Sequence, residues 1–143
     1  MIQTKDKSTL YGILCLLDIS LLTILSLKYH QLSRFDVVYI VSILVSHVIL
    51  FLSLWNQWCT IIDILHYFLF LSIVLAIFIK NKYLQFLVLL LVILIQVLWI
   101  YKGRCIMNTN DDENQNFWGF SNELTVVTLV YTVILSIKFG RSF

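Results

Sequence analysis

Three long apolar runs follow one another in this chain, at residues 37–55, 61–79 and 83–101. Each comes close to the roughly 20 residues that an α-helix needs to cross a bilayer. The breaks between them, at residues 56–60 and 80–82, have room only for turns. A water-soluble domain of 143 residues cannot cover this much apolar surface. The sequence therefore predicts an all-α membrane protein that crosses the bilayer several times.

Two further apolar runs flank these three, at residues 10–27 and 124–139, and a polar loop at 102–123 precedes the last. The first run follows a charged start, as in a signal peptide, but it is long and no small-residue cleavage site follows it. The last run reaches roughly 24 Å as a helix, and Lys138 can extend to the interface at its end. We expect one membrane domain, residues 1–143, with five spans.

Composition supports a membrane location and limits how the helices can pack. Only 13% of the residues are charged, against about a quarter in soluble domains. Membrane helices usually approach through small residues, but this chain has four Gly, no Pro and only Ala76 as alanine. Packing must then use Ser, Thr and large side chains, or partner subunits. Such residue usage is typical of an AT-rich genome and leaves the membrane open: plasma, organellar or viral.

Motifs for chemistry are missing from the sequence. It contains no Gly-rich phosphate loop, nucleophile elbow, Cys-x-x-Cys or His-Glu-x-x-His pattern. The net charge of +2 carries little information, but the lack of a basic cluster or a repeated basic-aromatic pattern argues against binding to nucleic acid. We expect no catalytic activity, no cofactor and no metal site. The expected partners are membrane lipid and either other membrane subunits or further copies of the chain.

Asp18 and His47 are the deepest ionisable residues, at about 12–14 Å from the same predicted face. A charge at that depth is costly and faces protein or water rather than lipid. We therefore expect the two side chains to meet inside the bundle. The pair can serve as a hydrogen-bonded tie between helices, which we favour, or as a proton relay.

Asp63 and His66 form a second polar pair, three residues apart on one helix face. Thr60 is expected to cap the start of this helix, with Asp63 at the positive end of the helix dipole and His66 at the interface. A metal site would need more than these two ligands. A single intramembrane histidine such as His47 is also compatible with haem ligation in a respiratory anchor subunit, a minor alternative.

Cys59 and Cys105 each follow a span on the same predicted face of the membrane, so they can form a disulfide where that face is oxidising.

A fourth set of residues lies in the last run, where hydroxylated side chains recur at spacings of 3, 4 and 4: Thr125, Thr128, Thr132 and Ser136. This stripe is expected to pack closely on another helix, with pore lining as the alternative. A serine stripe in the second run is the expected partner: Ser42, Ser46 and Ser53.

An internal repeat is suggested by landmark residues that recur after about 45 positions. Trp55 recurs as Trp99, and Cys59 as Cys105, so that spans one and two would match spans three and four as helical hairpins. Chance is the favoured explanation because the offsets between the matching residues are not equal.

The preferred function is a non-enzymatic structural or assembly subunit of a membrane complex. The alternatives are a small channel or proton-coupled transporter using Asp18 and His47, and a haem- or quinone-binding anchor subunit.

Orientation follows from the basic residues, which favour the cytoplasmic side. One end of a five-span bundle receives Lys5, Lys7, Lys102 and Arg104, and the other receives Lys28, Arg34, Lys80, Lys82, Lys138 and Arg141. The second end is therefore predicted to be cytoplasmic, with the polar loop outside.

A protease site inserted between Asn110 and Asn116 should be cleaved by protease added to intact cells. Cleavage that occurs only after permeabilisation would reverse this orientation.

Overall fold

The computed structural model describes residues 4–102 and 121–141, and these residues form only helices. The α-helices and the two short 3-10 helices follow in the order α1 (Thr4–Leu27), η1 (Tyr29–Gln31), α2 (Arg34–Asn56), α3 (Cys59–Leu75), η2 (Ala76–Phe78), α4 (Lys82–Lys102) and α5 (Ser121–Gly140). The described part of the chain contains no strand. The predicted all-α fold is confirmed.

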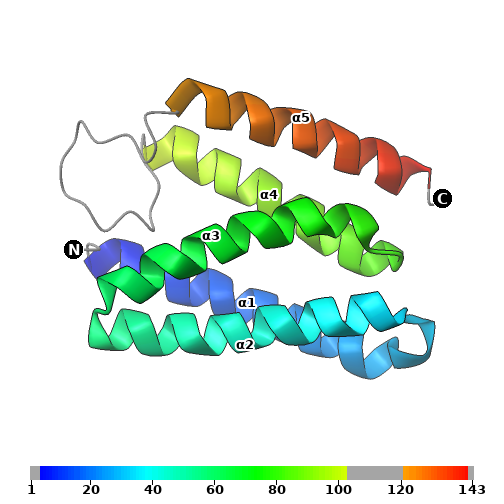
Figure 1. Ribbon diagram of the computed structural model, residues 1–143, viewed down its shortest axis with the longest axis horizontal. Helices are drawn as coiled ribbons and strands as arrows, with labels where there is room; N and C mark the ends of the chain where they lie inside the picture. Colours follow the sequence, from blue (N-terminus) through cyan, green and yellow to red (C-terminus); the bar gives the residue numbers. More distant parts are fainter. Residues whose placement is uncertain (1–3, 103–120, 142–143) are drawn as a thin grey trace.

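Three stretches of the described residues are long and apolar enough to cross a membrane: Lys7–Leu27, Arg34–Asn56 and Cys59–Phe78. Two shorter apolar stretches, Lys82–Leu98 and Leu129–Gly140, belong to α4 and α5. Successive helices alternate in direction, so the start of α1 and the end of α5 lie at opposite ends of the bundle (Figure 1). The chain is a small helical membrane bundle.

The helices extend beyond the apolar runs because polar residues close their first turns. α2 begins at Arg34, where the Ser33 hydroxyl accepts a hydrogen bond from the Asp36 N–H at 3.2 Å. Asp36 returns a bond by accepting from the Ser33 N–H at 3.0 Å, which completes a capping box. Asn81 caps α4 in a similar way, because its side-chain oxygen accepts from the N–H groups of Tyr83 and Leu84.

The start of α3 differs from the expectation. The helix begins at Cys59, and its N-cap is Trp58, which makes no side-chain capping hydrogen bond. Thr60 therefore lies inside the first turn, and the prediction that its hydroxyl caps the helix is wrong. Asp63 lies beyond that turn, because the first turn contains no acidic residue. The α2–α3 connection is shorter than expected and leaves room only for Gln57, in a left-handed conformation, and Trp58.

The end of α3 is held by side chains from other helices. α3 tightens after Leu75 into η2, where the single alanine, Ala76, is 1% exposed. Backbone carbonyl groups at this end accept hydrogen bonds from side chains of other helices: Ser72 accepts from Tyr39, Val74 from Tyr131, Ile77 and Ile79 from Lys138, and Ile79 also from Gln85. These donors come from α2, α4 and α5. A carbonyl left without a donor inside lipid would cost several kcal/mol, about the value for an unsatisfied polar group.

Asp36 is fully buried and joins α2 to the connection before α4. Besides the capping box, its second carboxylate oxygen accepts from the Lys80 N–H at 3.0 Å. Its charge also acts on the Lys138 ammonium group of α5. One carboxylate therefore fixes three parts of the chain at the same end of the bundle.

Helix pairing does not follow two equivalent hairpins. α1 packs against α2, and α2 packs against α3, while α4 packs mainly against α5 and also against α1. The main core contains Ile40 of α2, Leu84 of α4 and Ile79 between them, each 0% exposed. The α3–α4 pair thus lacks the close packing of α1–α2, and this difference agrees with chance as the source of the apparent repeat.

Replacing Asp36 by alanine should lower the free energy of unfolding by about 2 kcal/mol or more, because it removes both a helix cap and a buried charge-assisted hydrogen bond. Thermal unfolding of the chain in detergent measures this loss. Arg34→Ala, an exposed change two residues away, is the matched control and should leave stability nearly unchanged. Equal stability of the two variants would contradict the role assigned to Asp36.

Candidate functional site

Asp18 of α1 and His47 of α2 are brought together by the structure. Nδ1 of His47 and Oδ1 of Asp18 are 2.5 Å apart. The His47 side chain is 7% exposed and that of Asp18 is 24% exposed. The contact that the sequence predicts is therefore present, and it joins the middle of two helices. A carboxylate and an imidazole in such contact can share one proton between them.

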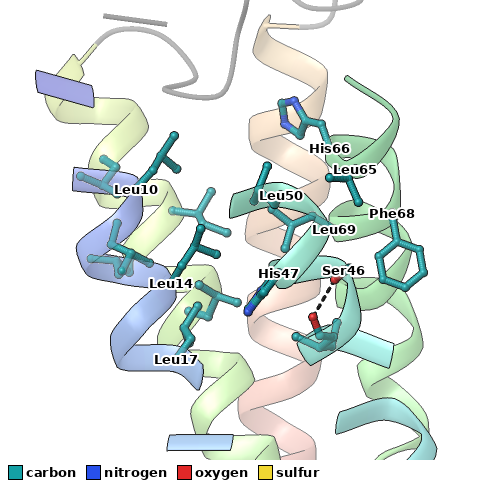
Figure 2. A pocket seen from close by; sticks show the side chains of 16 residues that line it. Leu10, Leu14, Leu17, Ser46, His47, Leu50, Leu65, His66, Phe68 and Leu69 are labelled. Atoms are coloured by element: carbon teal, nitrogen blue, oxygen red, sulfur yellow. Dashed lines mark hydrogen bonds between the residues drawn. The ribbon is translucent and has the colours of Figure 1, made fainter. Parts of the chain in front are cut away.

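His47 also borders a partly open cavity of about 100 Å³ between α1, α2, α3 and α4. Figure 2 shows leucines of α1 on one wall of the cavity and His66 and Phe68 of α3 on another. The lining is almost entirely Leu, Ile and Phe, with Ser46, His47 and His66 as its polar members. The Ser46 hydroxyl donates to the Ile43 carbonyl of its own helix at 2.7 Å. The walls of the cavity offer water few hydrogen-bond partners.

His66 is 9% exposed and lines the cavity, so its side chain faces the interior of the bundle. Its position at the membrane interface stays a prediction. Asp63 is half-buried one turn before it. Among the described residues, no group of three metal-ligand side chains gathers around this pair.

The size of the cavity bears on the haem and quinone alternative. Pockets for drug-sized ligands measure about 300–1,000 Å³. The cavity beside His47 and His66 is about 100 Å³. A haem macrocycle would require the helices to separate, so the residues present do not fit this group. The geometry supports no step that involves haem.

The hydroxyl stripe of α5 has a different neighbour from the one expected. Thr132 accepts a hydrogen bond from the Gln96 amide of α4 at 2.9 Å. Ser136 is exposed and bonds to the Thr132 carbonyl of its own helix. The side chains of Thr125 and Thr128 lie outside the described residues. The prediction that this stripe packs on the serines of α2 is wrong, because α5 packs against α4. On α2, Ser42 is exposed and Ser53 donates to a carbonyl of its own helix.

The cysteine pair stays a prediction. Cys59 is exposed at the start of α3, and Cys105 lies outside the described residues. The sequence analysis did not predict several contacts between the helices. They are the hydrogen bonds that side chains donate to backbone carbonyls, from Tyr39, Gln85, Tyr131 and Lys138, and those that the buried carboxylate of Asp36 accepts. Gln85 and Tyr131 stand out in the sequence as polar side chains within apolar runs, but nothing in their spacing identifies the carbonyls to which they donate.

Asp18→Asn should be tolerated, because an amide oxygen can still meet the imidazole of His47. Asp18→Leu should lower the free energy of unfolding by about 1–2 kcal/mol, because it leaves the histidine without this partner. Unfolding in bicelles measures both values. The matched control is Ser20→Ala in the same helix, whose hydroxyl bonds only to the Leu16 carbonyl and which should be nearly neutral. A Leu variant as stable as the Asn variant would show that the contact carries no stabilisation.

Comparison of the chain with protein-family models, with curated proteins and with solved structures finds no match. The features that bear on function are therefore those of the chain itself. They are the Asp18–His47 contact, the apolar cavity that His47 borders, and the hydrogen bonds that join the helices.

Proposed function

We propose that this chain is a non-enzymatic structural subunit of a larger membrane assembly. The observation that carries the proposal is the use of its deep polar residues. Among the described residues, side-chain hydrogen bonds link pairs of helices, including Asp18–His47 between α1 and α2, Tyr39 to the Ser72 carbonyl between α2 and α3, Tyr131 to the Val74 carbonyl between α5 and α3, and Gln96–Thr132 between α4 and α5. Each is a tie of the kind that fixes helix positions in membranes.

Asp18 and His47 therefore belong to a set rather than forming an isolated charged site. A transport path needs polar groups that follow one another along the bundle. The ties instead lie at separate helix contacts, and the cavity beside His47 is apolar. This arrangement favours a rigid scaffold over a conduit.

The outer faces of the spans support a role within an assembly. In the most apolar windows of α1, α2 and α3, only 17%, 33% and 28% of the residues are buried inside the bundle. Most of the surface of these helices is thus available to lipid or to other subunits. Exposed apolar side chains such as Leu16, Val38 and Ile64, each 60% exposed or more, lie on these faces.

Proton-coupled transport is the second candidate, and one observation favours it. Asp18 and His47 are close enough to exchange a proton, and His66 lies on another wall of the same cavity. Entry of water into that cavity would place two histidines on one wet path. Transport would then require ionisation of Asp18, whereas a structural tie would not.

Reconstituted vesicles distinguish the two candidates. If the chain is structural, proton flux should equal that of protein-free vesicles, and Asp18→Asn should change neither flux nor assembly size. The native mass of the assembly, measured in mild detergent, should exceed the 16.8 kDa of one chain. Ser20→Ala serves as the control for reconstitution. Flux that Asp18→Asn abolishes, in a variant that still assembles, would replace the structural proposal with transport.

A further inference from the structure

One end of the bundle carries a concentrated positive charge. We call this the basic end, and it comprises residues 28–36, 76–85 and 135–141. It holds six of the ten basic residues: Lys28, Arg34, Lys80, Lys82, Lys138 and Arg141. Its single acidic residue, Asp36, is fully buried and accepts hydrogen bonds from backbone N–H groups. The exposed charge of this end is therefore entirely positive.

Two of these cations are gathered around one aromatic ring. The Lys28 ammonium lies 5.1 Å from the centre of the Tyr83 ring, and the Lys82 ammonium lies 5.6 Å from it. Lys28 follows the end of α1, whereas Lys82 is the first residue of α4, so the fold brings them together from distant parts of the sequence. Each gains a cation–π contact with the ring. Since both lie close to one ring, their separation is at most about the 10 Å over which charges interact at 0.1 M salt, and they repel each other weakly.

The depth of this cluster points to the kind of anion that would relieve the repulsion. α4 begins at Lys82, so the cations lie where the apolar span starts. The basic end also carries exposed aromatic side chains, with Tyr29 at 56%, Phe78 at 62% and Tyr83 at 45% exposure. Aromatic residues of this kind sit at the headgroup level of a bilayer. At that level the abundant anions are the phosphates of phospholipids, and basic residues near the cytoplasmic surface attract anionic lipids.

We propose that Lys28, Lys82 and Tyr83 form a binding site for the headgroup of an anionic phospholipid. The two ammonium groups contact the phosphate, and the Tyr83 ring holds both lysines in place while its hydroxyl supplies a further donor. The site does not depend on the structural role proposed above. It would anchor the α1–α2 connection and the start of α4 to the same leaflet.

Native mass spectrometry of the full chain in a nonionic detergent tests the site, with phosphatidylglycerol and phosphatidylcholine as probes. The chain should retain phosphatidylglycerol in preference to phosphatidylcholine, and 0.5 M salt should weaken this preference. The double variant K28Q/K82Q should bind phosphatidylglycerol about 25-fold more weakly, since each lysine near an anionic surface contributes about fivefold. The matched control K5Q/K7Q also loses two positive charges, at the start of α1 and so at the opposite end of the bundle, and should retain the affinity.

Three outcomes would overturn the proposal. Equal retention of the two lipids by the wild-type chain would remove the site, and this measurement needs no variant that folds. Equal loss in both double variants would assign the effect to net charge rather than to the Tyr83 cluster. Inorganic phosphate that displaces the bound lipid at millimolar concentration would identify a site for a soluble anion instead.

Discussion

The hydrogen-bonding needs of backbone inside lipid govern the arrangement of this bundle. A continuous helix meets those needs alone, but α3 ends at Leu75 and tightens into η2 before the chain turns. Backbone carbonyls around this break accept hydrogen bonds from side chains of α2, α4 and α5. Lys138 donates to two of them, which places a cation at the negative end of the α3–η2 segment. Hydrogen bonds to this break thus help to position three other helices.

The sequence predicts the number and order of the helices well, because an apolar run of about 20 residues has few ways to be accommodated other than by crossing a bilayer. It predicts their ends less well. Ser33 and Asp36 read as loop residues but form the capping box of α2, and Trp58 rather than Thr60 precedes α3. Polar residues at helix ends can belong to the helix through capping hydrogen bonds, which a hydropathy pattern does not predict. Helix pairing was beyond reach, since runs that are apolar on every face carry no period that identifies a neighbour.

The candidate site shows the same division. The meeting of Asp18 and His47 could be anticipated because the cost of a deep charge is large and its depth can be counted along a helix. The cavity beside them could not be anticipated, because its shape depends on how the side chains of four helices pack together. The hydroxyl stripe of α5 likewise could not specify its neighbour, since small side chains fit many surfaces. Gln96, a longer side chain with two donors, reaches Thr132 and marks α4 as that neighbour.

Whether the Asp18–His47 pair acts as a tie or a relay depends on what surrounds it. A relay must receive a proton from one side of the membrane and release it to the other, so it requires water or polar groups on both sides. His47 faces a cavity with an almost wholly apolar lining, in which water would find few of the two to four polar partners it needs. A tie requires only that the two side chains remain in contact. The apolar lining beside His47 thus favours the tie, because a hydrogen bond is stronger where the local dielectric is low.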